Sequence, residues 1–175
     1  MLPTFKYHPD PIGTGSVVAR KDAPCACCGQ ARGYVYTGPV YGPRELRGAL
    51  CPWCIADGSA AARFDAVFVD PDQFETNLAR EVVTEISTRT PGYSGWQQET
   101  WLTCCSDGCE FRGDASLQEL KALGPAEVEG ALAAWGWEAE HWPEFLRNYS
   151  PGGDASVFGF KCRHCGRAQY ALDLS

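Results

Sequence analysis

The sequence predicts an α+β protein made of two zinc-ribbon-like modules, with a helical insertion in the second. Two observations lead to this prediction. The ten cysteines of the 175-residue chain fall in four clusters, and CxxC pairs commonly supply the thiolates of tetrahedral zinc sites. A segment of helical character separates the last two clusters, and strand-like runs flank it. We expect a first module at residues 1–70, a helix and connecting loop at 71–99, and a second module at 100–175 with its insertion at 114–149.

The composition restricts the classes of function. Hydrophobic residues make up 45% of the chain, which argues against wholesale disorder. The formal net charge of −7 disfavours a broad nucleic-acid-binding surface, because phosphate binding depends largely on Lys and Arg. The N-terminus has no apolar segment typical of a secretory signal. The sequence contains no run of about 18 apolar residues, so no membrane span is predicted. We therefore expect a cytoplasmic protein without membrane insertion, where many cysteines indicate metal ligation rather than disulfides.

Two CxxC pairs define the first predicted site. Cys25 and Cys28 are followed, after 22 intervening residues, by Cys51 and Cys54. Each CxxC turn delivers two sulfurs from one tight loop, and Zn²⁺ takes four such ligands. A redox role for the second pair is the alternative, because its interior is Pro-Trp and a short helix is predicted after it, at residues 55–64. A redox role would leave the first pair without a function, and no βαβ pattern surrounds the second pair. We therefore prefer structural zinc.

A hairpin is predicted between the two pairs. The aromatic runs at residues 34–36 and 40–41 are separated by Thr37-Gly38-Pro39. Such a hairpin would return Cys51 to the side of Cys25.

The second predicted site combines Cys105 and Cys109 with Cys162 and Cys165, across 52 intervening residues. Neighbouring residues of a strand face opposite ways, so only one of Cys104 and Cys105 is expected to face the ion, and the choice between them stays open. Strand-like runs lie before the insertion at residues 101–105 and after it at 157–161 and 168–174; we expect them to pair.

An internal repeat supports the two sites. Residues 25–31 and 162–168 share the pattern CxxCGxA. Glycine after the second cysteine favours a metal knuckle, because the backbone there tends to need positive φ. The two sites leave Cys27 and Cys104 without a ligand role, and His164 is expected to be exposed rather than a ligand.

Helices are predicted elsewhere. Apolar residues four apart predict a helix over 71–90, and Pro and Gly predict an ordered loop over 89–99. In the insertion we expect three helical segments, at 115–123 with Asp114 as its cap, at 126–137, and at 138–149. Three tryptophans of this region are expected to be core residues: Trp135, Trp137 and Trp142.

No convincing catalytic constellation is found in the sequence. It contains no nucleotide-binding loop, nucleophile elbow or HExxH pair. His8 and Asp10 resemble a base with its orienting carboxylate, but prolines at 9 and 11 favour a packed N-terminal arm. Asp57 and Ser59 are interpreted as helix caps.

The chain resembles the CbrC family of bacterial proteins. The resemblance extends over essentially the whole chain and rests on the stretches LPTFKYHPDPIGTGSV, CACCGQARGYVYTGPVY, CPWCIADGSAAARFD, RTPGYSGWQQETWL and FKCRHCG. It implies a cytoplasmic zinc-binding protein linked to colicin tolerance, with no assigned reaction. The implied ligands are Cys25, Cys28, Cys51 and Cys54, then Cys105, Cys109, Cys162 and Cys165. The family pattern has a histidine before the first cysteine of the second site, where this chain has Cys104.

Three hypotheses of function follow. The first is a binding or adaptor protein in a bacterial stress or envelope response, stabilised by two structural zinc ions and contacting an unknown protein partner through exposed aromatic loops. The second is a thiol-based redox enzyme or sensor that uses a CxxC pair or one of the spare thiols, Cys27 and Cys104. The third, nucleic-acid binding, would depend on six basic residues: Arg32, Arg44, Arg47, Lys161, Arg163 and Arg167.

Overall fold

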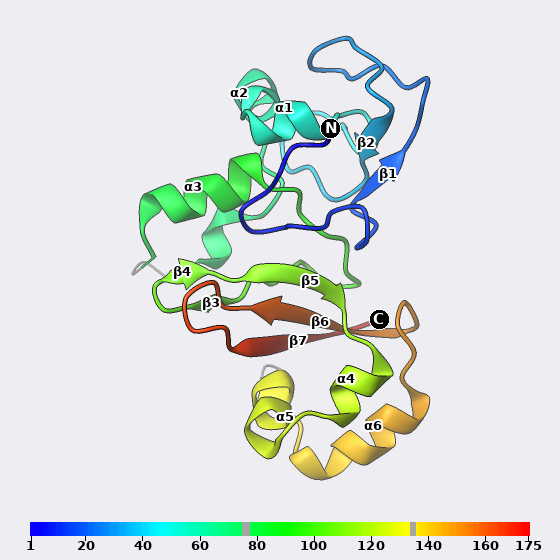
Figure 1. The fold of residues 1–175 in the computed structure, drawn as a ribbon, viewed down its shortest axis with the longest axis vertical. Helices are drawn as coiled ribbons and strands as arrows, with labels where there is room; N and C mark the ends of the chain where they lie inside the picture. The colour runs from blue at the N-terminus through cyan, green and yellow to red at the C-terminus, as the bar shows by residue number, and fades with distance from the viewer. Residues whose placement is uncertain (75–77, 134–135) are drawn as a thin grey trace.

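The chain folds into three layers that succeed one another along the long axis of the molecule (Figure 1). We describe residues 1–74, 78–133 and 136–175 of a computed structural model. Helices α1 and α2 lie with strands β1 and β2 at one end, the sheet β5–β6–β7 lies in the middle, and helices α4 to α6 cover the other end. The result is a mixed α/β fold with small antiparallel sheets.

The first strands pair differently from the prediction. Strand β1 (Val17–Ala19) is antiparallel to β2 (Tyr34–Tyr36), so the predicted hairpin between residues 34–36 and 40–41 is wrong. Tyr41 instead bridges Val67. Pro39, just before the second run, has no N–H to donate to a ladder. A bridge between Tyr36 and Leu50 still brings the second CxxC pair back towards the first.

Two short helices replace the single helix predicted after the second CxxC pair. Helix α1 covers Pro52–Ala56 and α2 covers Ser59–Phe64. Gly58, with φ of 78°, separates them. The Asp57 carboxylate accepts a hydrogen bond from the Ser59 N–H at 2.8 Å, but Gly58 occupies the N-cap position of α2 and no side chain caps the helix, so the predicted capping of α2 by Asp57 or Ser59 is wrong.

The helix predicted over 71–90 is only partly formed. A 3₁₀ turn, η1, covers Pro71–Gln73, and helix α3 covers Arg80–Arg89. Residues 75–77 of the predicted helix lie outside the described residues. Residues 91–100 contain no regular element, as expected for an ordered loop.

The second half contains a two-residue hairpin and a three-stranded sheet. Strands β3 (Thr103–Cys104) and β4 (Asp107–Gly108) form the hairpin. Strand β5 (Glu110–Asp114) pairs with β6 (Ala155–Lys161), which pairs with β7 (Ala168–Leu174). The last two strands match their predicted ranges closely. The expected pairing of residues 101–105 with these strands is wrong, because the chain turns back at residue 105 and β5 takes that edge.

The described part of the insertion is helical. It contains α4 (Leu117–Lys121), α5 (Pro125–Leu132), the 3₁₀ turn η3 (Ala139–His141) and α6 (Trp142–Asn148). The described helices include none long and apolar enough to cross a membrane.

Capping of α4 differs from the prediction. Ser116 rather than Asp114 is its N-cap, in a capping box with Glu119. Asp114 lies in β5, where its carboxylate accepts hydrogen bonds from the Tyr149 hydroxyl and the Val157 N–H. The side chain thus ties the sheet to the end of the insertion.

The predicted tryptophan core is found in part. Trp142 is buried and stacks on Phe145 at 5.2 Å between ring centroids. Trp137 is 39% exposed, so it is not a core residue. Trp135 lies outside the described residues.

The N-terminal arm belongs to the aromatic core of the second half. Tyr7 is fully buried in that core, and its carbonyl accepts a hydrogen bond from the Phe111 N–H at 2.8 Å. His8 is also fully buried; its Nδ1–H donates to the Pro91 carbonyl at 2.7 Å, and its Nε2 is hydrogen-bonded to Thr14 Oγ1 at 2.6 Å. The interpretation of His8 as part of a packed arm is therefore confirmed.

Candidate metal centres

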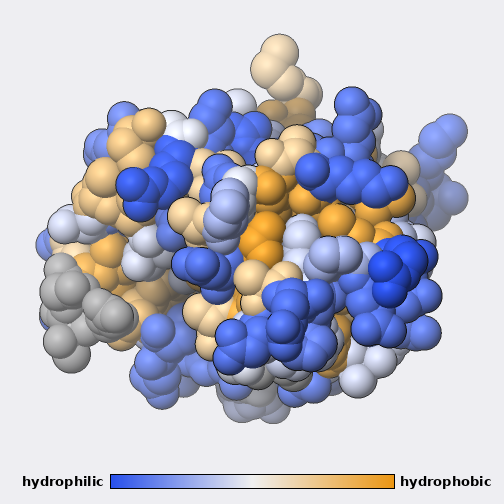
Figure 2. Space-filling view, turned by 90° about the horizontal axis from the view of Figure 1, so that it is seen from below, coloured by the Kyte–Doolittle hydropathy of each residue, from blue (hydrophilic) through white to orange (hydrophobic). Residues whose placement is uncertain are grey.

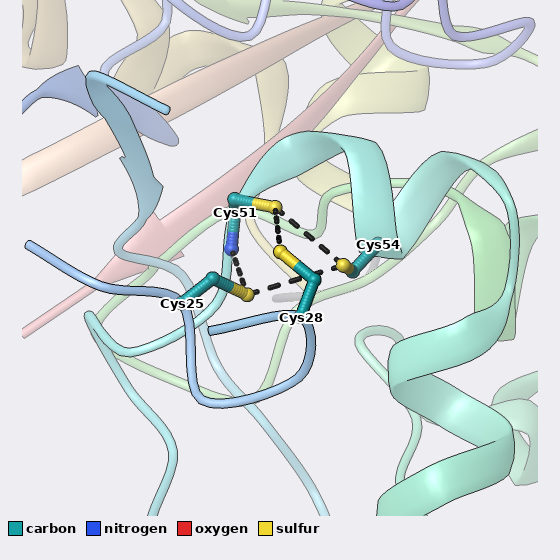
Figure 3. A group of neighbouring side chains, drawn as sticks. All are labelled: Cys25, Cys28, Cys51 and Cys54. Atoms are coloured by element: carbon teal, nitrogen blue, oxygen red, sulfur yellow. Dashed lines mark hydrogen bonds between the residues drawn. The ribbon is translucent and has the colours of Figure 1, made fainter. Parts of the chain in front are cut away.

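Four cysteines of the first half point their sulfurs at one another (Figure 3). The Sγ atoms of Cys25, Cys28, Cys51 and Cys54 all lie within 4.8 Å of one another. The distance is 3.9 Å from Cys25 to Cys54, 3.9 Å from Cys28 to Cys51, and 3.6 Å from Cys51 to Cys54. Sulfurs bound tetrahedrally to Zn²⁺ at about 2.3 Å lie roughly 3.8 Å apart. The group therefore has the dimensions of a tetrahedral thiolate site.

The local backbone explains how these sulfurs meet. The Gly29 N–H donates to the Cys25 carbonyl at 2.7 Å, and Gly29 has φ of 74°, as predicted for a knuckle. The Ala26 N–H donates to the Ala49 carbonyl at 2.8 Å, which holds the knuckle beside the chain entering α1. Cys51 is the N-cap of α1, so the helix presents Cys54 one turn later.

The second group forms at the tip of the β3–β4 hairpin. The Sγ atoms of Cys104, Cys105, Cys162 and Cys165 lie within 4.8 Å of one another. The sulfur of Cys104 is 3.7 Å from that of Cys105 and 3.8 Å from that of Cys165. These spacings equal those of the first group and again suit a tetrahedral ion.

The two neighbouring cysteines reach one point because Cys105 is not on a strand. Cys105 and Ser106 form the turn of the hairpin, with φ of 53° and 58°. Strand alternation, the basis for expecting only one of Cys104 and Cys105 at the ion, does not apply through such a turn.

Cys109, an expected ligand, lies outside the second group. It is fully buried in the aromatic core, and its sulfur accepts a hydrogen bond from Gln169 Nε2 at 3.2 Å. It follows β4 directly, where its N–H donates to the Leu102 carbonyl. The structure thus assembles Cys104 where the sequence pattern suggested Cys109, because the turn reverses the chain before Cys109 is reached.

The two knuckles are alike in backbone geometry. In the second, the Gly166 N–H donates to the Cys162 carbonyl at 3.1 Å, and Gly166 has φ of 73°. The Cys162 N–H donates to the Arg167 carbonyl at 2.8 Å, as the Cys25 N–H does to Gln30 at 3.0 Å. The repeated CxxCGxA pattern therefore encodes one repeated turn.

The first cysteine of each knuckle is disposed to be a thiolate. Burial raises the pKa of Cys25, but N–H groups of Cys28, Cys51 and Cys27 outweigh it and lower the pKa to about 7. N–H groups of Cys165 and His164 lower the pKa of Cys162 to about 6. Burial raises the pKa of Cys51 to about 11, and the pKa values of Cys54, Cys104 and Cys105 are also raised. Metal binding would release their protons.

A buried carboxylate supports the second knuckle. Asp107 Oδ1 accepts from the Tyr7 hydroxyl at 2.5 Å, and Oδ2 accepts from His164 Nε2 at 2.8 Å and from Arg163 at 3.1 Å. Burial would raise the pKa of Asp107, but the bonds from Tyr7 and His164 prevail and lower it. His164 is half exposed and not in the sulfur group, in line with its predicted place. Sequence reasoning missed Asp107, since no pattern relates it to Tyr7, 100 residues away.

The spare thiol of the first half is enclosed. Cys27 is 7% exposed, and its sulfur lies 3.6 Å from Ser59 Oγ. Its carbonyl accepts a hydrogen bond from Arg63. Cys27 therefore lies outside the sulfur group and faces helix α2.

A cavity without cysteines in its lining lies between the helical insertion and the ends of β6 and β7. It has a volume of about 660 Å³ and is lined by aromatic side chains, among them Trp137, Phe145 and Tyr149. Glu144 and Asp154 add carboxylates to its lining. Figure 2 views the molecule from this end and shows hydrophobic residues in the middle of the face, surrounded by hydrophilic ones.

The chain matches one family and several relatives. The sequence model of the uncharacterised protein family UPF0167 matches residues 2–174. The UPF0167 protein PA1536 of Pseudomonas aeruginosa is 49% identical over 176 residues, covering 99% of this chain and 98% of the relative. The UPF0167 proteins Mb2317 of Mycobacterium bovis and MT2352 of Mycobacterium tuberculosis are each 44% identical over 172 residues, covering 94% of this chain and 89% of each relative. No solved structure matches the chain.

Proposed function

This chain belongs to the uncharacterised protein family UPF0167, and on that premise we propose that it is a zinc-stabilised binding or adaptor protein. Four thiolates complete the coordination of each zinc and leave no position open for water or substrate. The two ions are therefore structural in this proposal, which assigns no reaction to the chain. Metal binding would contribute on the order of 10 kcal/mol of folding free energy at each site.

One observation supports the metal assignment above the others: two separate sets of four sulfurs have the spacing of a tetrahedral ion. Thiolates in this geometry select Zn²⁺ or iron. The geometry suits both ions; we propose zinc, and the metal content of the purified protein distinguishes it from iron.

The cavity of the insertion supports the binding role. Pockets of a few hundred Å³ with apolar walls and a few polar groups are the usual form of ligand sites. The cavity of about 660 Å³ between Trp137 and Tyr149 has this character, and it lies away from the cysteines. In this proposal the sulfur groups hold the fold, and the insertion makes the contact with a ligand or a protein partner.

The proposal also includes a biological setting. The resemblance to the CbrC family implies a bacterial cytoplasmic protein that acts in a stress or colicin-tolerance response.

Metal content tests the proposal directly. The purified native protein is analysed by elemental mass spectrometry, and its thiols are alkylated before and after chelation. We expect two zinc ions per chain, with rapid alkylation of the ligand cysteines only after chelation. Iron in place of zinc, visible as a coloured thiolate complex, would contradict the assignment, and so would a folded protein without metal.

The thiol-redox alternative is addressed by the same alkylation. A reactive Cys27 would be modified quickly while both zinc ions stay bound. Its 7% exposure favours slow modification.

Nucleic-acid binding has little support in the structure. Arg163 is paired with Asp107, and Arg32 lies over the ring of Trp53, 5.4 Å from its centroid. These contacts engage two of the six basic residues, and the net charge of −7 opposes phosphate binding by the others. A shifted band in a low-salt gel assay would overturn this view.

A further inference from the structure

The two sulfur groups differ in their exposure. In the first group, Cys25, Cys51 and Cys54 are 2%, 1% and 3% exposed. In the second, only Cys162 is comparably buried, at 2%, while Cys105 and Cys165 are exposed. A chelator or a competing metal-binding thiol can therefore reach the sulfurs of the second group, but most of the first group is shielded.

The groups also differ in their importance for the core. Cys25, Cys51 and Cys54 are themselves members of the first hydrophobic core, packed with residues such as Ile55 and Phe68. Loss of that ion would leave buried thiols at the centre of a core. Of the second group, only Cys162 is a buried member of a core, and Cys104 packs partly against it.

The core beside the second group is held together without a metal. Its aromatic rings pack on one another, with Tyr93 stacked on Phe111 at 4.1 Å between centroids. Strands β6 and β7 are paired over their full length, from Ala155 with Leu174 to Lys161 with Ala168. We therefore expect the sheet to survive the loss of the second ion.

The turn that carries two of the ligands is strained. Cys105 and Ser106 both have positive φ, and turns of this kind strongly prefer Asn and Gly. The hairpin around them has only two residue pairs, Thr103 with Gly108 and Cys104 with Asp107. Strained backbone persists where the surroundings over-determine it. Asp107 anchors the β4 side of the turn, and an ion held by Cys104 and Cys105 would fix the other side.

From these differences we infer that the second group is an exchangeable metal site, and that release of its ion opens the hairpin at residues 103–108 and frees the adjacent thiols of Cys104 and Cys105 to react. The first ion stays in place and keeps the fold. This inference rests on the proposed function, because it requires a thiophilic ion such as Zn²⁺ at both groups. It makes the β3–β4 hairpin a device that responds to the availability of free metal.

The test follows the release of metal from the full-length, zinc-loaded protein. EDTA is added, and the zinc content of each chain is counted by native mass spectrometry over time. In parallel, iodoacetamide alkylation is mapped to individual cysteines, and hydrogen exchange is measured along the backbone. We expect the ion of the second group to leave at least roughly tenfold faster than the ion of the first group, because strain and exposure weaken only the second site. Its loss should coincide with alkylation of Cys104, Cys105 and Cys165, and with faster exchange confined to residues 103–108 and 162–166.

A matched pair of variants provides the control. Cys28 and Cys105 are each an exposed member of their group, so Cys28→Ser and Cys105→Ser each remove one accessible thiol. We expect Cys105→Ser to retain one zinc and the near-ultraviolet circular dichroism of the native core. Cys28→Ser should lose that signal or fail to fold. Equal effects of the two variants would contradict the inference.

The outcomes separate this inference from the proposed function. Two zinc ions that leave at equal rates, or a first group that empties before the second, would overturn the inference but leave the zinc assignment intact. A folded chain that binds no metal would overturn both.

Discussion

Asp107 is the residue on which most contacts around the second knuckle converge. It is 6% exposed and accepts hydrogen bonds from Tyr7, His164 and Arg163, which come from two distant parts of the chain. Buried charged groups with such partners are costly to alter, because the partners lose their acceptor.

We predict that Asp107→Asn destabilises the zinc-loaded protein by about 1–3 kcal/mol. The amide has one acceptor oxygen, so it cannot serve Tyr7 on one side and His164 with Arg163 on the other. Urea denaturation followed by tryptophan fluorescence measures the change. Asp22→Asn, at an exposed position, is the matched control and should have almost no effect. Equal midpoints for the two variants would show that the network contributes little.

The buried His8 is expected to make the free energy of unfolding depend on pH. It is fully buried between Pro91 O and Thr14 Oγ1, and burial lowers its pKa from 6.5 to about 4. Below pH 6.5 the unfolded state binds a proton that the folded state rejects. The contribution of His8 is therefore complete above pH 6.5 and is lost as the pH falls towards 4, by about 3 kcal/mol in total.

The measurement compares the wild type with His8→Gln, which keeps a side chain able to donate and accept hydrogen bonds. The free energy of unfolding is determined at several pH values from 7 down to 4 at constant zinc. We expect the wild type to lose more stability than the variant over this range. The pH dependence of the thiolate sites is common to both proteins, so it cancels in the difference. Parallel curves would rule out His8 as the source.

At the level of secondary-structure elements, the β3–β4 hairpin is the least favourable local structure. An L-residue in the left-handed region costs roughly 1–2 kcal/mol, and the turn contains two, Cys105 and Ser106. We predict that Ser106→Gly stabilises the protein by about 1 kcal/mol, after the extra freedom of glycine in the unfolded chain is subtracted. Ser106→Ala keeps the backbone cost and should give no gain. Thermal unfolding at equal zinc content distinguishes the two variants, and a gain in both would point to the lost hydroxyl instead.

Elements defined by local signals were predictable from the sequence. The Gly124-Pro125 boundary begins α5, and the apolar runs ending in Lys161 and Leu174 form β6 and β7. Both depend on residues close in the chain, such as a proline at the first helical turn or a β-rich run.

Pairing and ligand choice were less predictable because they depend on distant parts of the chain. The partner of β2 is β1, although a nearer aromatic run was available. Cys104 and Cys109 exchanged roles because a left-handed turn at Cys105 reverses the chain, and neither residue of that turn is a glycine or an asparagine that would have signalled it.

At the level of the whole molecule, the contacts cross the predicted module boundaries. The aromatic core of the second half includes Tyr7, Val69 and Ile86, all from before residue 100. Glu99 is nearly buried, accepting hydrogen bonds from the Tyr41 hydroxyl and the Asp70 N–H. Domains fold independently only where few contacts cross between them. The predicted division of the chain into modules at residues 70 and 99 stays a prediction. Because the core is shared across these boundaries, we expect the chain to unfold as one cooperative unit.

This expectation is tested with the fragment of residues 100–175. It contains all four sulfurs of the second group and the three-stranded sheet, so it retains every ligand of that metal site. We predict that it does not fold with zinc, because Tyr7 belongs to the same core as Phe111 and supplies the carbonyl for its N–H. Nuclear magnetic resonance spectra of the fragment should show poor dispersion. Addition of the separately expressed fragment 1–99 should restore it, since the missing half of the core is then available. A well-dispersed spectrum of the zinc-bound fragment alone would instead establish the second module as an independent domain.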